Sequence, residues 1–548
     1  MRQSFFEISI IVMLIFLAVL PAAKLGLNLA IAIPLGHAVF LCGVSLFALE
    51  LARRVNRLLG TLLFGMIVAL LGAEITTFAL TGLHVNSFTI SLLLEGNARE
   101  NIGIGVALPA FLIGVVLISI LLARRRPRKP KRLQLRTTLF AAVCGALFTQ
   151  LAYALLFFYG TPGVVEVRRQ LPFFQALHPY YIERALSPIL GVRPQNPFAL
   201  PNETGGTPSR PESIHIPTPR SVLFVIMDSV RAKDIIANPA IAPNVTILGK
   251  TGQQSLNHYS ASNCTHFSMF SMFTGTLPTS FGRTRQQGRP SGLVPILQAN
   301  GYHVSTAEAL SLDWYDLSRL LLSGADRHVA QEGTSRERDS FVTQKTIEIL
   351  SRQTAQPFFH LAYYNGAHFP YGDSEPINGL TGGTINSYTN AISAVDAQVG
   401  RITDQLQELI TRDNLLVIIT SDHGENIFEH GIVGHASALT DEQTIVPLIA
   451  LNTDNAPLPR SQTDIFGYLL RQLGAAVPHA VQQPQPIILS NCSYEVPSGF
   501  AVIGTFGRAD FIYEDGFLSP VASPLGHMPP KQVQLEAARQ LVNVIEAN

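Results

Sequence analysis

Five long apolar stretches occupy the first third of the chain and predict membrane-spanning helices. Each is long enough to cross a hydrocarbon core of roughly 30 Å as a helix. We place them at residues 6–23, 27–49, 58–83, 102–123 and 137–160. The first stretch is not typical of a cleavable signal peptide, because four more apolar stretches follow it. The pattern therefore predicts a multi-pass α-helical membrane domain with five spans over residues 1–164.

From residue 221 onward, short apolar runs that resemble strands alternate with helical stretches. The predicted strands are 221–227, 302–306, 358–364, 415–420 and 446–451. The predicted helices are 265–274, 291–300, 340–353, 386–411 and 463–473. This alternation is typical of an α/β domain with a doubly wound, parallel sheet and helices on both faces. We assign that domain to residues 221–548.

Residues 165–220 connect the two predicted domains. Aromatic side chains near Phe173, Phe174, Tyr180 and Tyr181 lie just past the fifth apolar stretch. Such residues are enriched at membrane–water interfaces. A tract rich in Pro, Gly and Thr then runs from Asn196 to Arg220 and indicates an extended tether. The connector is therefore an interfacial segment followed by a linker.

Basic residues are distributed unevenly among the membrane loops and set the predicted orientation. Three arginines lie between the second and third stretches, and eight lysines and arginines lie within residues 124–136. The other two loops contain only Lys24 and Arg99. Because basic loops stay in the cytoplasm, we predict a cytoplasmic N-terminus and a C-terminal domain on the outer side.

Overall composition excludes some classes of partner and scaffold. The net charge is +1 and charged residues make up 14% of the chain, which gives no sign of nucleic-acid binding. Four cysteines do not make a disulfide scaffold. Cys264 and Cys492 lie in the predicted outer domain, where a disulfide is chemically permitted. The sequence leaves their pairing open.

Polar side chains follow two of the predicted strands. Asp228 comes directly after strand 221–227, and the pair Asp422-His423 lies just past strand 415–420. Open α/β sheets place their chemistry at the carboxyl ends of their strands. The pattern therefore predicts one site assembled from distant segments.

Thr265 supplies a hydroxyl at the start of predicted helix 265–274, where backbone N–H groups favour an anion. Together with Asp228, Asp422 and His423 it offers three oxygens and one nitrogen, which suits a divalent cation such as Zn, Mn or Mg. A bound cation would lower the hydroxyl pKa, so we predict Thr265 as both metal ligand and nucleophile. Two alternatives stay open: Thr265 only caps the helix, or Cys264 is the nucleophile.

Two histidines are candidates for a catalytic acid or an anion binder. His368 follows strand 358–364, and His435 lies just beyond the Asp422-His423 pair. Histidine is the side chain whose unperturbed pKa best suits proton transfer near neutral pH. A purely structural role for each histidine is the alternative.

Several short motifs follow one another in a characteristic order. They are Asp228-Ser229-x-Arg231, Asn263-x-Thr265, Tyr388-x-x-Ala391-Ile392-x-x-Val395-Asp396, Ser421-Asp422-His423-Gly424-Glu425, Gly434-His435 and Val446-Pro447-Leu448. In this order they resemble the sulfatase-like branch of the alkaline phosphatase superfamily over about residues 221–475. With the predicted spans, the chain looks like lipid-surface phosphotransferases. These include lipoteichoic acid synthases, phosphoethanolamine transferases and, most similar, the YejM (PbgA) family of inner-membrane proteins.

Two departures from the family pattern restrict the chemistry that this resemblance implies. Sulfatases convert a Cys or Ser to formylglycine within Cys-x-Pro-x-Arg, and the stretch Cys264–Ser268 lacks both the Pro and the Arg. Calcium-binding sulfatases carry paired aspartates after the first strand, whereas Ser229 follows Asp228 here. Sulfate-ester hydrolysis is therefore not expected.

The resemblance implies a location and two hypotheses for function. The location is the bacterial inner membrane, with the C-terminal domain in the periplasm. The first function is a metal-dependent phosphotransferase or hydrolase that acts on phospholipid or lipopolysaccharide-type envelope substrates. The second is a non-catalytic lipid or lipopolysaccharide sensor that regulates outer-membrane biogenesis through a cytoplasmic or inner-membrane regulatory protein.

Overall fold

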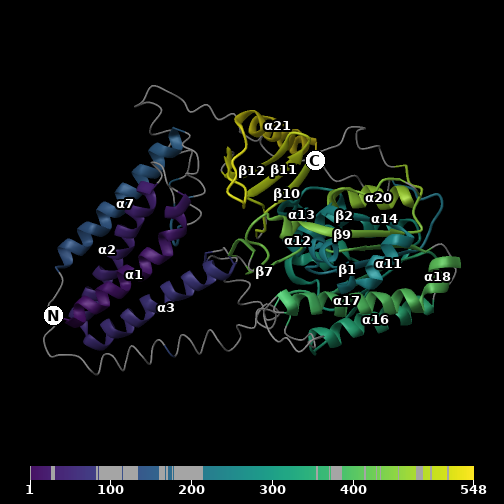
Figure 1. Ribbon diagram of the computed structural model, residues 1–548, viewed down its shortest axis with the longest axis horizontal. Coiled ribbons are helices and arrows are strands. Elements are labelled where there is room, and N and C mark those ends of the chain that lie inside the picture. Colours follow the sequence, from purple (N-terminus) through teal and green to yellow (C-terminus); the bar gives the residue numbers. More distant parts are fainter. Residues whose placement is uncertain are drawn as a thin grey trace. The chain divides into compact units, whose positions relative to one another are not determined.

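The computed structural model (Figure 1) divides the described residues into two compact units. One consists of residues 1–199 with 511–522, and the other of residues 200–510 with 523–548. The structure describes residues 2–25, 31–81, 84–85, 114, 134–159, 167, 171–175, 177, 214–352, 356–369, 371, 385–412, 415–427, 429–431, 433–454, 456–476, 486–493, 496–514 and 517–547.

Four long helices make up most of the described part of the first unit: α1 (Arg2–Leu25), α2 (Ala32–Val55), α3 (Arg57–Thr81) and α7 (Leu135–Phe158). Within the described residues, three are long and apolar enough to cross a membrane, namely α2, α3 and α7, and α1 contains a shorter apolar stretch. The predicted fourth span, 102–123, falls outside the described residues except for Gly114. Apolar N-terminal helices are confirmed, and the number five stays a prediction.

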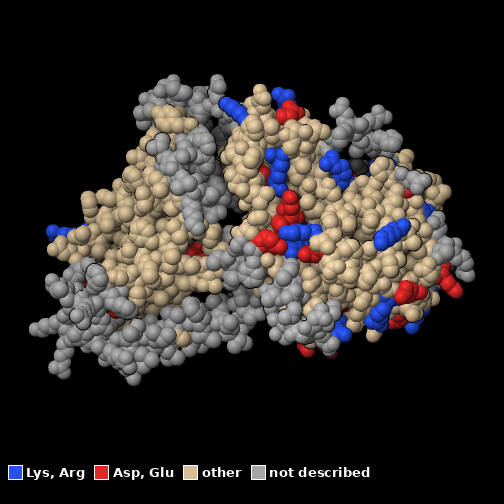
Figure 2. All heavy atoms as spheres, in the orientation of Figure 1, with Lys and Arg blue, Asp and Glu red and all other residues tan. Residues whose placement is uncertain are grey.

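Helices α2 and α7 pack with their backbones in close approach. A Cβ atom added at Gly43 would lie 2.4 Å from the backbone nitrogen of Ala142, and one at Gly145 would lie 2.5 Å from that of Phe40. Small residues at such contacts are typical of helix packing in membranes. On the side shown in Figure 2, the described surface of these helices carries almost no charge, whereas charged side chains of both signs are scattered over the second unit.

The predicted interfacial aromatics do not all face outward. Phe173 is exposed, but Phe174 packs edge-on against the rings of His37 and Tyr153. The carbonyl of Pro172 is hydrogen-bonded to Nε2 of His37 at 2.7 Å. This segment therefore folds back onto the helices, because His37 gives it a polar partner inside the bundle.

A seven-stranded sheet forms the centre of the second unit, in the order β2-β9-β6-β1-β5-β3-β4. Its strands are β1 (Val222–Met227), β2 (Gln253–Tyr259), β3 (His303–Glu308), β4 (Asp326–Val329), β5 (Phe358–Tyr364), β6 (Leu416–Thr420) and β9 (Ile445–Leu451). Every residue of β1, β5 and β6 is buried. Continuous apolar runs are typical of strands covered on both faces, which places these three in the middle of the sheet.

The sheet is mixed, which corrects the prediction of an all-parallel sheet. Strands β6, β1, β5, β3 and β4 are parallel, but β9 runs antiparallel to β6, and β2 antiparallel to β9. A parallel return needs a crossover of a dozen or more residues, usually a helix. Between β6 and β9 the described helical segments are only a 3₁₀ turn and the four-residue α19. The chain therefore returns at the edge where β6 ends, and β9 runs antiparallel to β6.

Helices cover both faces of this sheet (Figure 1). On one face Leu223, Val225 and Met227 of β1 pack with residues of α11, α16 and α17. On the other face Phe224 contacts Phe273 of α12 and Phe359 of β5. The described α-helices of this unit, of which α21 packs on the C-terminal sheet instead, are α10 (Ala232–Ala237), α11 (Pro243–Thr251), α12 (Thr265–Thr274), α13 (Phe281–Gln287), α14 (Leu293–Ala299), α15 (Leu317–Leu321), α16 (Ser335–Ser351), α17 (Ile385–Gln405), α18 (Gln407–Arg412), α19 (Asp441–Thr444), α20 (Ile465–Gln472) and α21 (Lys531–Ala547).

A four-stranded sheet follows in the C-terminal part of the chain, in the order β10-β11-β12-β13. Its strands are β10 (Ile487–Ser490), β11 (Gly499–Gly504), β12 (Gly507–Glu514) and β13 (Phe517–Val521). A two-stranded hairpin, β7 (Asn426–Ile427) with β8 (Val433–Gly434), lies between β6 and β9 in sequence. A parallel bridge joins Ser262 to Ser490, so β10 lies next to the segment that leads into α12.

Candidate metal centre

The four predicted metal-binding residues meet at the carboxyl edge of the main sheet. Asp228 follows β1, and Asp422 and His423 follow its parallel neighbour β6. Thr265 is the first residue of α12. All four side chains are buried, with Thr265 the most exposed at 4%. Adjacent parallel strands end at the same edge of a sheet, which is why residues so distant in sequence come together.

The donor atoms lie at distances suited to one small cation. Nε2 of His423 is 3.1 Å from Oγ1 of Thr265, 3.5 Å from Oδ2 of Asp422 and 3.8 Å from Oδ1 of Asp228. A tetrahedral ion with bonds of about 2.0–2.2 Å places its ligands about 3.3–3.6 Å apart. The cluster therefore matches a four-coordinate site closely enough for a small adjustment to complete it.

His423 presents the right nitrogen to that site. Its Nδ1 is 3.0 Å from the carbonyl oxygen of Gly424, so Nδ1–H donates there and Nε2 is left as an acceptor. Burial lowers the pKa of His423 to about 4, despite the opposing charge of Asp228. A neutral imidazole is the form that coordinates a metal.

The two buried carboxylates, Asp422 and Asp228, differ in their hydrogen bonding. Burial and then the charge of Asp228 raise the pKa of Asp422 to about 7, and Oδ2 of Asp422 has no hydrogen-bond partner within the described part of the chain. Asp228 accepts hydrogen bonds from Tyr363, Asn365 and Ser229 at 2.5–3.0 Å. A buried acceptor without a partner beside a second carboxylate fits a cation that neutralises both.

His368 and His435 lie together beside this cluster. Their ring centroids are 5.0 Å apart, and the ring of His435 is 4.1 Å from that of His423. Burial acts to lower the pKa of His368, but the charges of Asp228 and Glu425 raise it above its ordinary value. Burial and the neighbouring His423 lower the pKa of His435. Of the two, His368 therefore retains its proton to higher pH.

Glu425 organises both histidines and was assigned no role from sequence. Its Oε1 is 2.9 Å from Nδ1 of His435 and accepts from the backbone N–H of Phe369. The carbonyl of the same Phe369 is 2.7 Å from Nδ1 of His368, and Tyr371 donates its hydroxyl to Oε2 of Glu425. The sequence signal that could have identified Glu425 was its position at the end of the Ser421–Glu425 motif. Tyr363, which donates to Asp228, gave none, because it belongs to a strand typical of a core.

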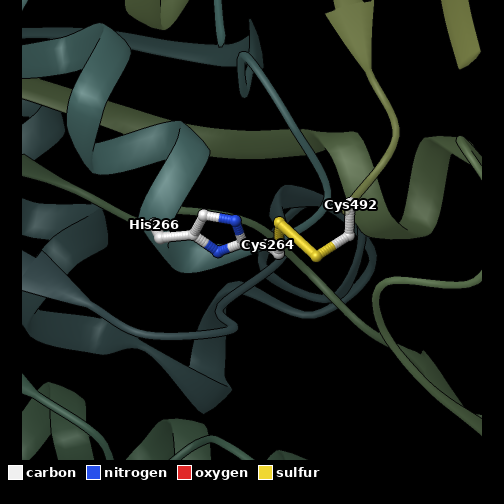
Figure 3. A group of neighbouring side chains, drawn as sticks. All are labelled: Cys264, His266 and Cys492. Carbon is white, nitrogen blue, oxygen red and sulfur yellow. A yellow bond between two sulfur atoms is a disulfide. The ribbon is translucent and has the colours of Figure 1, made fainter. Parts of the chain in front are cut away.

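The structure does not fit either alternative to Thr265 as nucleophile, namely that Thr265 only caps the helix or that Cys264 is the nucleophile. Cys264 is the N-cap residue of α12 and no side chain caps this helix, whereas the hydroxyl of Thr265 is hydrogen-bonded to His423. Cys264 forms a disulfide with Cys492, so it offers no free thiol (Figure 3). Cys264, His266 and Cys492 lie close enough to share an ion, but the disulfide uses both sulfurs.

These features identify the class of the second unit. A mixed α/β sheet carries an acid–histidine cluster and a helix-borne hydroxyl at one edge, as in alkaline phosphatase-like domains. Within that class, residues 220–475 match the family model described as Sulfatase. Residues 220–475 therefore match a sulfatase domain, and three of the described N-terminal helices are long and apolar enough to cross a membrane.

Similar curated proteins match parts of the chain. Inner membrane protein YejM of Salmonella typhimurium is 26% identical over 186 residues, which cover 33% of this chain and 30% of YejM. Human iduronate 2-sulfatase is 37% identical over 84 residues, 15% of each protein. The match thus spans less than a third of the length of YejM.

One solved structure resembles nearly the whole fold. The integral membrane protein lipooligosaccharide phosphoethanolamine transferase A (EptA) of Neisseria meningitidis has a TM-score of 0.52 and 16% identity to this chain. The similarity covers 85% of this chain and 96% of EptA. At this identity the likeness establishes a shared fold.

Proposed function

We propose that this chain is a metal-dependent phosphotransferase or hydrolase of the inner membrane that uses Thr265 as its nucleophile. The observation that carries the proposal is the placement of the Thr265 hydroxyl, 3.1 Å from Nε2 of His423 and beside two buried aspartates. The apolar helices would keep the domain at a membrane surface. Phospholipid or lipopolysaccharide-type molecules are therefore the proposed substrates, and the periplasm is the proposed location of the domain.

Asp228, Asp422, His423 and Thr265 would together hold one divalent cation, with Zn, Mn and Mg as the candidates. The partnerless Oδ2 of Asp422 and the neutral His423 fit this role. When bound, the cation would lower the pKa of the Thr265 hydroxyl and neutralise charge on a phosphoryl group.

The remaining groups supply a two-step transfer. The Oγ1 atom of Thr265, its proton lost to solvent, forms a bond to phosphorus while the bond from phosphorus to the leaving alcohol breaks. His368 gives its proton to that leaving oxygen, since nearby acidic charges favour its protonated form. An acceptor alcohol or water then attacks phosphorus, returns a proton to His368 and releases Thr265. His435 and Glu425 hold the geometry of this acid.

A phosphate ester is a better substrate than a sulfate ester. Formylglycine cannot form at Thr265, and Cys264 is joined to Cys492. The cluster also lacks the second aspartate after β1, where Ser229 donates a hydrogen bond to Asp228. The remaining donors form a small site that one cation would fill.

A second candidate is a non-catalytic sensor of lipid or lipopolysaccharide that works through a cytoplasmic or inner-membrane regulatory protein. The observation that favours it is the closure of the site, because Thr265 is only 4% exposed and His423 is fully buried. The likeness to YejM supports it as well. In this case the metal cluster would serve stability, and ligand binding would take place elsewhere.

A covalent intermediate distinguishes the two candidates. Full-length protein in detergent micelles, loaded with Mn²⁺ or Zn²⁺, is mixed with phospholipid or lipopolysaccharide and digested for mass spectrometry. The transferase predicts a phosphoryl-bearing adduct on Thr265 that is absent from Thr265→Ala. In cells that express Thr265→Ala at the normal level, the envelope phenotype should be that of cells without the protein. An unmodified Thr265 together with an unchanged phenotype would reject the enzyme and favour the sensor.

A further inference from the structure

Both sequence neighbours of Thr265 are fixed to the segment that follows β10. Cys264 is covalently bonded to Cys492, with their Cα atoms 5.5 Å apart. Nε2 of His266 is 2.8 Å from the carbonyl oxygen of Ser493. Figure 3 shows His266 at the start of its helix beside the bridging sulfurs. The candidate nucleophile therefore lies between two residues that are attached to adjacent positions of the C-terminal part of the chain.

The attachment continues upstream of the disulfide. The backbone N–H of Ser490 donates to the carbonyl of Ala261 at 2.9 Å, and Ser262 forms a parallel bridge with Ser490. Residues 261–266 and 490–493 thus run alongside each other. Residues 490–493 lie beyond position 475, where the Sulfatase match ends.

Asn263 extends the same arrangement toward His435. Its Oδ1 accepts from the N–H of Cys492 at 2.8 Å, and its Nδ2 donates to Oε1 of Gln443 at 2.8 Å and to the carbonyl of Ala438 at 3.0 Å. Its backbone carbonyl accepts from the N–H of Ala436, the residue after His435. Ala436 has a φ of +68°, a conformation that costs energy outside glycine and needs such fixing. Asn263 is itself fully buried.

We infer that the segment 490–493, joined through Asn263 and the Cys264–Cys492 disulfide, is a positioning element for Thr265 and His435. These residues touch no reacting atom; they act by holding the nucleophile and its neighbouring histidine within reach of the metal ligands. Transfer chemistry tolerates little error in such distances. The consequence for turnover rests on the proposed function, whereas the positioning itself does not.

Hydrogen exchange tests the positioning directly. In full-length protein, the Cys264→Ser/Cys492→Ser double variant should exchange amide hydrogens roughly tenfold faster or more in peptides 261–274 and 434–438. Peptide 222–227 of β1 should keep its wild-type protection. The matched control is Cys42→Ser/Cys144→Ser, which removes the two free cysteines and should behave as wild type. Unchanged exchange in 261–274, or equal acceleration in β1, would overturn the inference.

The visible absorption spectrum of bound Co²⁺ reports the geometry of the metal ligands and does not change with a general loss of stability. If Thr265 binds the cation, Thr265→Ala alters the visible spectrum of bound Co²⁺. At full Co²⁺ occupancy, the double cysteine variant should shift toward the Thr265→Ala spectrum, and a wild-type spectrum would overturn the inference. Wild-type protein that binds no Co²⁺ would defeat the metal centre of the proposed function, and hydrogen exchange would then decide the positioning by itself.

Asn263→Ala keeps the disulfide and provides the second variant. It leaves the N–H of Cys492 and the carbonyl of Ala438 without these hydrogen bonds, so exchange in 434–438 should rise while Cys264 and Cys492 stay oxidised. Wild-type exchange there in Asn263→Ala would show that the side chain of Asn263 does not position His435.

Discussion

Asp422→Asn should abolish stoichiometric binding of a divalent cation and leave the fold intact. The change removes a charged ligand from a four-donor site, and residues outside the first ligand sphere already contribute about 10- to 100-fold to metal affinity. We therefore expect affinity to fall by more than about 100-fold. The asparagine oxygen can still accept from the N–H of Ser229, which donates to Oδ1 of Asp422 at 3.2 Å. The neutral side chain also removes the repulsion between two buried carboxylates.

Elemental analysis and calorimetric titration of full-length protein measure the binding. Asp404→Asn is the matched control, because Asp404 is an exposed residue of α17. It should retain wild-type metal content. Melting temperatures measured with a chelator present should not be lower for Asp422→Asn than for wild type. One bound ion per chain in Asp422→Asn would contradict the proposed metal centre.

Arg231→Ala should destabilise the sulfatase domain by about 3 kcal/mol or more, since removing one partner of a buried charge network typically costs 3–5 kcal/mol. Arg231 is 1% exposed and forms ion pairs with Asp234 and Glu429. It also donates to the carbonyl of Glu425 at 2.8 Å and lies over the ring of Tyr388. The variant would leave Asp234 without its cation, leave Glu429 with Lys233 at 3.7 Å as its one ion-pair partner among the described residues, and open a cavity beside Gly424.

The single tryptophan of the chain, Trp314, lies in the sulfatase domain, so its fluorescence reports the unfolding of that domain. Arg231→Lys keeps the charge without the planar fork and should fall between alanine and wild type. Lys233→Ala provides the control, because Lys233 is 54% exposed and its ion pairs with Glu442 at 2.9 Å and with Glu429 at 3.7 Å are worth about 1 kcal/mol or less each. Equal midpoints for Arg231→Ala and Lys233→Ala would reject a structural role for Arg231.

Local patterns were sufficient to place the elements that hold the cluster. Helix 265–274 was predicted with the bounds it has, because small polar residues precede its apolar run and Gly275, in the left-handed region at φ +71°, ends it. The central strands were recognisable because burial on both faces leaves mostly apolar residues in them. In contrast, β2 (Gln253–Tyr259) was missed, since an edge strand half exposed to solvent has a polar sequence.

Features that depend on tertiary contacts could not be predicted from the sequence. The predicted helix 386–411 is two helices, α17 and α18, with Leu406 between them. The direction of β9 is set by a short return path rather than by its own sequence. Glu425 gained a role only once Phe369 and His435 were seen around it, and no local signal pairs Cys264 with Cys492.

The disulfide between Cys264 and Cys492 imposes an order on biogenesis. The two sulfurs are 228 residues apart, and a ribosome makes the earlier one first. Thr265, the proposed nucleophile, can therefore be locked in place only after residue 492 has been synthesised. A nascent chain that ends before residue 492 would carry every proposed ligand of the cation and still lack this constraint on the Thr265 hydroxyl, so its alignment waits until the segment after β10 has been synthesised.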